Sequence, residues 1–161
     1  MKPESIEHLI EKEPKNTMIV VIKPDAYFKH EEIKNIFREN GIDIKREVVK
    51  MLPLEFVNGE MYTNIPQEVQ FENAKHFSQG PSVVLELEGD EDLMEKVIKI
   101  TGEKTSPSEC DEGTIRELFG DKDGIDMING KKYYRNAIHR GKNAEEVMED
   151  KVKFETVFVG E

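Results

Sequence analysis

Residues 17–25, TMIVVIKPD, decide the fold class of this chain. Five consecutive apolar residues, most of them β-branched, are typical of a strand that is buried at the centre of a sheet. Pro24 fixes the exit of this strand, because proline has no backbone N–H to continue a ladder of hydrogen bonds. Lys23 is therefore predicted to lie at the end of a buried central strand.

The next segments along the chain alternate between helix and strand periodicity. Residues 31–40 (EEIKNIFREN) and 90–102 (DEDLMEKVIKITG) have apolar side chains at helical spacing. Residues 42–52 and 81–89 alternate as strands do, and a further helix is predicted after Pro66. This order of elements in one small domain predicts an α+β sandwich with an antiparallel sheet.

The remaining segments have weaker signals. Residues 120–136 (GDKDGIDMINGKKYYRN) are rich in glycine and charge, which predicts a long loop leading into a short strand at 133–138 (YYRNAI). The tail 154–161 (FETVFVGE) alternates like a strand. We predict two parts, an N-terminal helical extension at 1–16 and one domain at 17–161.

Net charge and cysteine content limit the classes of binding partner and the cellular compartment that we expect. The chain has 161 residues and a net charge of −11, so its field repels nucleic acids and anionic membranes. Cys110 is the single cysteine, and no apolar run is long enough to cross a bilayer. We therefore expect a cytoplasmic protein with neither a nucleic acid nor a membrane as partner.

Several side chains that can bind phosphate are dispersed along the chain. Residues 101–107 (TGEKTSP) imitate a phosphate-binding loop, but Glu103 separates the glycine from the lysine, so the spacing fails. Taken singly, each remaining candidate also has a structural interpretation, and the histidine of RNAIHRG (135–141) taken alone is better read as a packing residue. These candidates are Lys23, Thr105, Arg116, Asn136 and His139.

Four motifs that occur in a fixed order favour the functional interpretation of these residues. IVVIKPDAYF (19–28), SQGPSVVLELEG (78–89), TSPSECDEGTIRELFG (105–120) and RNAIH (135–139) resemble the ordered motifs of the nucleoside diphosphate kinase family. The resemblance covers about residues 17–154. It implies a ferredoxin-like βαββαβ sandwich with a four-stranded antiparallel sheet. It also implies transfer of the γ-phosphate of a nucleoside triphosphate to a nucleoside diphosphate by a ping-pong mechanism.

The same resemblance implies roles for individual residues. His139 would be the nucleophile that becomes phosphohistidine, oriented by Asp150 where the family has a glutamate eleven residues after the histidine. The aromatic residue that stacks on the base would be Phe71. The residues implied to bind the nucleotide are Lys23, Phe71, Lys99, Thr105, Arg116 and Asn136, with Tyr62 near the site.

These residue types suit phosphoryl transfer. Neutral imidazole is a good nucleophile near neutral pH, and cationic side chains stabilise the charge that spreads over the phosphate oxygens. Mg²⁺ would arrive on the nucleotide phosphates, so no metal site of the protein is expected. The family further implies a homo-oligomer, either a hexamer or a tetramer.

The chain also departs from the family pattern. Arg140-Gly141-Lys142 follows the histidine where the family has a hydroxyl and a carboxylate, which predicts positive charge beside the ring. One inserted residue between Gly102 and Thr105 makes Lys99 an ambiguous match for a family arginine. These departures leave two alternatives: a catalytically weakened nucleotide-binding or protein-interaction module of the same fold, or a structural domain without a nucleotide site.

Overall fold

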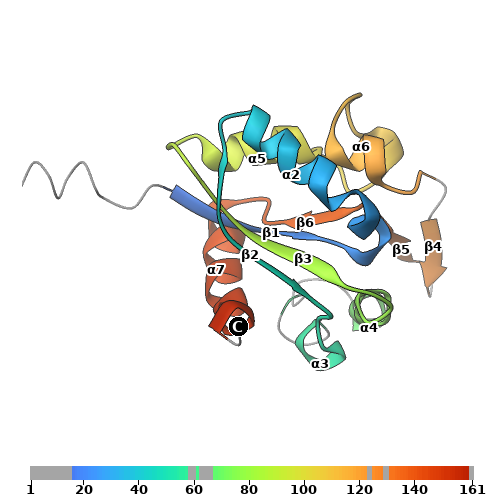
Figure 1. Ribbon diagram of the computed structural model, residues 1–161. Coiled ribbons are helices and arrows are strands. Elements are labelled where there is room, and N and C mark those ends of the chain that lie inside the picture. The colour runs from blue at the N-terminus through green and yellow to red at the C-terminus, as the bar shows by residue number, and fades with distance from the viewer. Residues whose placement is uncertain (1–15, 58–60, 62–66, 123–124, 129–130, 160–161) are drawn as a thin grey trace, which may run out of the picture.

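A four-stranded antiparallel sheet organises the computed structural model, and helices cover both of its faces (Figure 1). The structure describes residues 16–57, 61, 67–122, 125–128 and 131–159. The strands are β1 Asn16–Ile22, β2 Asp43–Lys50, β3 Ser82–Gly89, β4 Ile125–Ile128, β5 Lys131–Tyr134 and β6 Ile138–Arg140. The helices are η1 Pro24–Lys29, α2 His30–Glu39, α3 Leu54–Phe56, α4 Gln67–Phe77, α5 Leu93–Thr101, η3 Pro107–Glu109, α6 Ile115–Phe119 and α7 Ala144–Val159.

The strand order β2-β3-β1-β6 confirms the predicted ferredoxin-like βαββαβ sandwich. The first β-α-β unit is β1-α2-β2 and the second is β3-α5-β6, and β1 lies between β3 and β6. The apolar run after Asn16 is therefore the central strand, as predicted. Its pairing with β3 extends from Asn16 opposite Gly89 to Ile22 opposite Val83.

Alternation along β1 divides the core into two layers. Val20 and Ile22 belong to the hydrophobic cluster of α2 and α5, whereas Ile19 and Val21 belong to the cluster that contains Phe154 of α7. Successive side chains of a strand point to opposite faces, so a strand buried on both faces needs an unbroken apolar run. β1 has that run because helices cover it on both sides.

The prediction of a long loop at 120–136 is wrong. β4 and β5 form an antiparallel hairpin, with Ile125 opposite Tyr134 and Ile128 opposite Lys131, and β5 lies against α4. The sequence between the two strands is Asn-Gly, which is a strong sequence signal for a hairpin. The loop prediction rested on the glycine and charge content of the segment instead. The strand predicted at 133–138 is also placed wrongly, because β5 ends at Tyr134 and β6 begins at Ile138.

The prediction of a strand-like C-terminal tail is also wrong, because α7 continues to Val159. Its buried residues Asp150, Phe154, Val157 and Phe158 follow the helical period of three to four residues. This period, not the alternation of residues 154–159, determines the structure of the tail. The predicted N-terminal helix at 1–16 falls outside the described residues except for Asn16, the first residue of β1.

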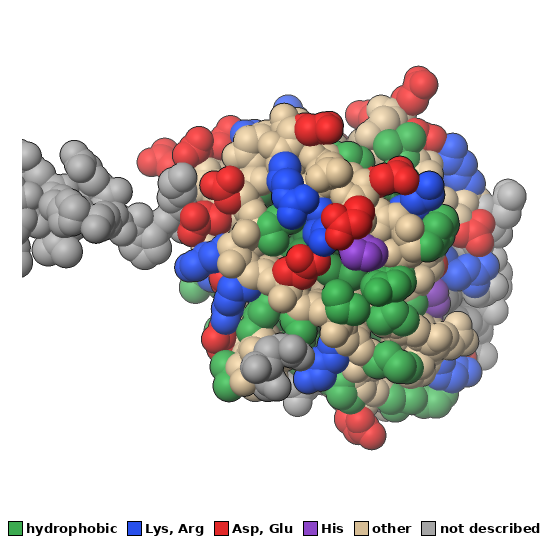
Figure 2. Space-filling model, in the orientation of Figure 1, with side chains coloured by type: hydrophobic (Ala, Val, Ile, Leu, Met, Phe, Trp, Pro, Cys, Tyr) green, Lys and Arg blue, Asp and Glu red, His purple; other side chains and the backbone are tan. Residues whose placement is uncertain are grey.

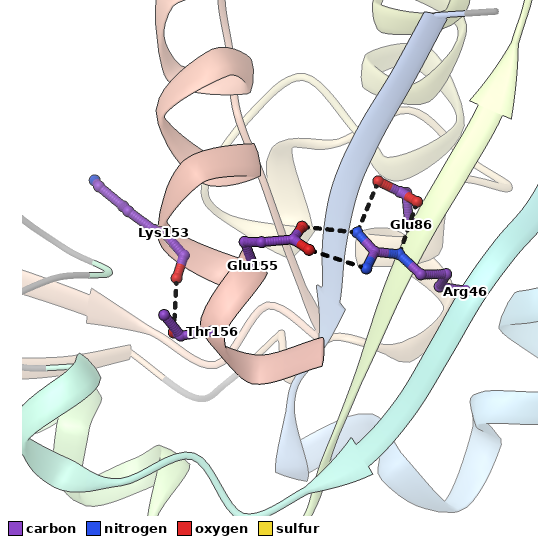
Figure 3. A network of polar contacts seen from close by, with 5 residues as sticks. All are labelled: Arg46, Glu86, Lys153, Glu155 and Thr156. Carbon is purple, nitrogen blue, oxygen red and sulfur yellow. Dashed lines mark hydrogen bonds and ion pairs between the residues drawn. The ribbon is translucent and has the colours of Figure 1, made fainter. Parts of the chain in front are cut away.

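A network of charges fixes α7 to the sheet. Arg46 of β2 pairs with Glu86 of β3 at 3.0 Å and with Glu155 of α7 at 2.9 Å (Figure 3). The Arg46 guanidinium also lies 4.2 Å from the centre of the Phe158 ring. Because Arg46 and Glu86 are opposite each other in the β2–β3 register, the network joins two strands and one helix.

The surface mixes charges of both signs. Figure 2 shows acidic and basic side chains interspersed on the displayed face, together with a group of hydrophobic side chains. In the part of the chain that the structure describes, no helix combines the length and the apolar character needed to cross a membrane.

Candidate active site

β6 presents consecutive residues to opposite faces of the sheet. Val21 of β1 is opposite His139, and Val20 is opposite Arg140. Paired residues of an antiparallel ladder point to the same face. His139 therefore shares the face of Val21, which α7 covers, while Arg140 points to the face covered by α2 and α5.

His139 is held by a carboxylate from α7. Its Nε2 lies 3.1 Å from Oδ2 of Asp150, and the side chains are 12% and 5% exposed. An ionised carboxylate only accepts hydrogen bonds, so Nε2 donates and carries the proton of the neutral ring. Nδ1 is then the unprotonated nitrogen with nucleophilic character. The shorter carboxylate of Asp150 thus reaches the histidine, eleven residues earlier in the chain.

Lys23, at the end of β1, lies next to Asn136, which precedes β6. Its Nζ donates to Oδ1 of Asn136 at 2.7 Å, and Nδ2 of Asn136 donates to the carbonyl oxygen of Thr105 at 3.0 Å. Burial lowers the pKa of Lys23 to about 8, although the charge of Asp25 raises it and the charge of Arg116 lowers it further. The site therefore contains a buried lysine whose pKa lies well below the ordinary value for this side chain.

Arg116 donates to three backbone carbonyl oxygens near the site. Its guanidinium donates to the carbonyl oxygens of Lys104 at 2.9 Å and of Ile138 at 3.1 Å, and more weakly to that of Gly102 at 3.4 Å. This buried side chain fixes the loop before η3 to the residue that precedes His139. Its predicted role in binding phosphate oxygens stays a prediction.

The prediction that Arg140 adds positive charge beside the reactive ring is wrong. Arg140 is buried on the opposite face of the sheet from His139, with Nε donating to Oγ1 of Thr101 at 3.0 Å. Its NH2 group donates to the carbonyl oxygen of Gly102 at 2.6 Å. The alternation of side chains along β6 is the physical reason, because residues next to each other in a strand cannot share a face.

Two further residues, which the sequence patterns did not single out, contact this site. Asp25 Oδ2 accepts a hydrogen bond from the backbone N–H of Ala137 at 3.0 Å, and Asp25 Oδ1 lies 2.9 Å from Nε2 of His76. The Lys-Pro-Asp motif quoted for Lys23 already contained Asp25 and could have identified it. His76 had no comparable signal, since it lies 51 residues from Asp25 in the sequence.

The other predicted site residues are Phe71, Lys99 and Tyr62, and within the described part of the chain neither Phe71 nor Lys99 has a hydrogen bond or ring contact to His139. Phe71 is 44% exposed on α4, with Nζ of Lys75 5.1 Å from the centre of its ring, so it is not a core aromatic. Lys99 is exposed on α5, and none of the hydrogen bonds between described residues joins it to His139. Tyr62 lies outside the described residues.

The described residues contain no group of three or more His, Cys, Asp or Glu side chains arranged to hold a metal ion. What they bring together is a carboxylate-bound imidazole, a buried lysine and a buried arginine. An imidazole held by a carboxylate is suited to nucleophilic attack on phosphorus, and cationic side chains are suited to bind an anionic phosphoryl group.

Comparison with known proteins identifies the family. The family model for nucleoside diphosphate kinase matches residues 16–157. The nucleoside diphosphate kinase of Chlamydia trachomatis serovar D is 33% identical over 121 residues, which cover 73% of this chain and 83% of the relative. The enzyme of Chlamydia caviae is 34% identical over the same shares.

Solved structures agree with this result. The Aquifex aeolicus nucleoside diphosphate kinase superposes with a TM-score of 0.72 and 25% identity, over 86% of this chain and 94% of that one. A Borrelia burgdorferi nucleoside diphosphate kinase with bound vanadate and ADP has a TM-score of 0.71 at 19% identity, over 86% of each chain, and shares the fold.

The fold, the site and these comparisons define a phosphotransferase that acts on nucleotides. The chain belongs to the nucleoside diphosphate kinase family, and its activity is that of a nucleoside diphosphate kinase.

Proposed function

We propose that this nucleoside diphosphate kinase transfers phosphate by a ping-pong mechanism in which Nδ1 of His139 is the covalent carrier. The observation that carries the proposal is the 3.1 Å contact between Nε2 of His139 and Asp150. By holding the proton on Nε2, Asp150 leaves the lone pair of the neutral ring on Nδ1.

The proposed reaction has two symmetrical halves. The lone pair of Nδ1 attacks the γ-phosphorus of a nucleoside triphosphate, the bond to the β-phosphate oxygen breaks, and the nucleoside diphosphate leaves with that electron pair. An oxygen of the acceptor β-phosphate then attacks the phosphorus, and the P–N bond breaks to restore the imidazole. Asp150 stabilises the positive charge that the ring carries while it is phosphorylated.

In this proposal, cationic side chains and the Mg²⁺ ion of the nucleotide bind the phosphates. Lys23 and Arg116 supply positive charge near the transferred group, and Asn136 and Thr105 orient the phosphates and sugar hydroxyls. Mg²⁺ enters as part of the substrate, bound to phosphate oxygens. Phe71 is the candidate for stacking on the base, in line with its exposure on α4, and Lys99 and Tyr62 keep their predicted places near the nucleotide.

Assembly and location stay as predicted from the family resemblance. We propose a homo-oligomer, hexameric or tetrameric, in the cytoplasm. Light scattering coupled to size-exclusion chromatography would measure the number of subunits.

Intact-mass spectrometry after brief incubation with ATP and Mg²⁺ tests the proposed carrier. The wild-type chain is expected to gain one acid-labile phosphoryl group and to lose it when a second nucleoside diphosphate is added. His139→Ala is expected to gain none, while His30→Ala, which removes a histidine stacked on Tyr27, serves as the matched control. Nucleotide binding without any gain of mass in the wild type would favour the catalytically weakened module.

A further inference from the structure

The turn before His139 has an unusual backbone. Ala137 has a φ of 73°, the single positive value among the described residues other than glycine. The N–H of Ile138 donates to the carbonyl oxygen of Asn136 at 2.9 Å, which closes a three-residue turn around Ala137. A γ-turn of this hand is strained for a residue with a side chain. The turn must therefore be stabilised by its surroundings.

Two residues that follow β1, Lys23 and Asp25, hold this turn. The carbonyl oxygen of Ala137 accepts a hydrogen bond from the N–H of Lys23 at 2.8 Å, which continues the pairing of β1 and β6. The N–H of Ala137 donates to Oδ2 of Asp25 at 3.0 Å. Both polar backbone groups of the strained residue are thus bound to the Lys-Pro-Asp segment.

Asp25 is itself held by α4. Its second oxygen, Oδ1, lies 2.9 Å from Nε2 of His76, and the two side chains are only 13% and 11% exposed. A carboxylate with one oxygen on each of two partners has little rotational freedom. His76 therefore determines where Asp25 presents its other oxygen to Ala137.

The surroundings keep Asp25 ionised. Burial alone raises its pKa, but the hydrogen bond from His76, the charges of Lys23 and His76 and the N–H of Ala137 outweigh burial and lower it. An ionised carboxylate is the stronger acceptor for a backbone N–H. The Asp25 contact to Ala137 is therefore a charge-assisted hydrogen bond at neutral pH.

We propose that His76 is a positioning residue for phosphoryl transfer, which acts through Asp25 to hold the Ala137 turn and so to fix Asn136 and His139. His76 does not touch the reacting atoms in this scheme. The inference rests on the proposed role of His139 as carrier, and it gives α4 a function in the chemical step.

The alternative is that His76 only stabilises α4 against the rest of the fold. The two cases differ in the expected effect of removing the imidazole. A positioning role predicts slower transfer in fully folded protein, since misplacement of a reacting group by about 1 Å is enough to slow a reaction by about 100-fold. A purely structural role predicts a lower melting temperature with an unchanged rate in the folded fraction.

The test compares the single-turnover rate of His139 phosphorylation at saturating ATP in three variants. His76→Ala is expected to lower this rate by about 10-fold or more, by analogy with misplaced reacting groups. His76→Gln keeps an N–H donor for Asp25 and is expected to recover most of the rate. His30→Ala is the control and is expected to match the wild type, because His30 stacks on Tyr27 and is not among the described groups that act on Asp25.

A double-mutant cycle tests the route through Asp25. If His76 acts through this carboxylate, adding His76→Ala to Asp25→Ala lowers the rate no further. Fully additive losses would overturn the proposal. So would a His76→Ala variant that phosphorylates His139 at the wild-type rate, or one whose loss equals its unfolded fraction.

Amide hydrogen exchange at Ala137, measured by NMR, separates this inference from the proposed function. His76→Ala is expected to increase exchange of the Ala137 N–H, while His76→Gln and His30→Ala are not. If the wild-type chain gains no phosphoryl group, the covalent-carrier proposal fails, and the exchange result still decides whether His76 holds the turn. Unchanged exchange in His76→Ala overturns the inference even when the wild type is phosphorylated.

Discussion

Arg140 donates a hydrogen bond of 2.6 Å to the carbonyl oxygen of Gly102, from the face of the sheet opposite to the one that His139 occupies. Gly102 ends α5 with a φ of 111°, and its carbonyl also accepts a weaker bond from Arg116. Arg140, one of the residues that depart from the family motif, is thus part of the support for the loop that leads to Thr105. It is not an extra charge at the histidine.

Replacing Arg140 is therefore expected to weaken the fold around this loop. Arg140→Met removes the donors for two buried acceptors, the Gly102 carbonyl and Thr101 Oγ1. The Gly102 carbonyl then keeps only the weak bond from Arg116, and losing these two bonds to a charged group is expected to reduce the free energy of unfolding by about 1–3 kcal/mol in total. Urea unfolding measures this loss. Lys142→Met is the matched control, since Lys142 is 73% exposed, and an equal loss there would contradict the assignment.

The affinity for nucleotide is expected to depend on the charge of Lys23. Because burial lowers the pKa of Lys23 to about 8, the side chain is protonated below that pH and loses its charge as the pH rises through it. Titration calorimetry should show ADP binding weakening across this range. Arginine keeps its charge at these pH values, so Lys23→Arg should flatten the dependence if the variant binds at all.

The same shift has a consequence for stability. The folded pKa of Lys23 is below its ordinary value of 10.5, so the unfolded chain binds more protons between these two values. The contribution of Lys23 to the free energy of unfolding should therefore rise with pH from about 8 to 10.5. The difference in urea midpoint between wild type and Lys23→Met, followed over this range, measures the contribution.

Asp150 is expected to act through the tautomer of His139. Asp150→Ala removes the acceptor at Nε2, and loss of a carboxylate that orients a catalytic histidine lowers rates by about 100-fold or more. The phosphorylation rate of His139 under single-turnover conditions is the measurement. Glu149→Ala, one residue earlier on α7, controls for the loss of a nearby charge. A similar decrease in both variants would point to general electrostatics.

The charge network of Arg46 is expected to stabilise the docking of α7. Arg46→Met leaves Glu86, whose side chain is 9% exposed, without this cation, which should reduce the free energy of unfolding by about 1–3 kcal/mol. The double variant Arg46→Met/Glu86→Leu should recover part of the loss, since no buried charge is then unpaired. Urea unfolding measures these changes, and Lys45→Met, at the neighbouring exposed position, should be near wild type.

Local patterns predicted most of the fold correctly. The apolar run of β1, the helical periods of α2 and α5 and the alternation of β2 depend on which side chains lie next to each other along the chain. The β4–β5 hairpin and the end of α7 differ from the predictions, although an Asn-Gly turn signal and the helical spacing of Phe154, Val157 and Phe158 are present in the sequence. Both features are therefore predictable from the sequence in principle.

The sequence by itself determined the order of helices and strands, the central position of β1 and the residue types that can transfer phosphate. The tertiary structure alone decided which side chains meet. Lys23 and Asn136 are 113 residues apart, and Asp25 and His76 are 51 apart. Their contacts depend on strand register and helix packing, and the same register turns His139 toward Asp150 and Arg140 away from it. No local pattern specifies that register, because it depends on how the whole sheet buries its two faces.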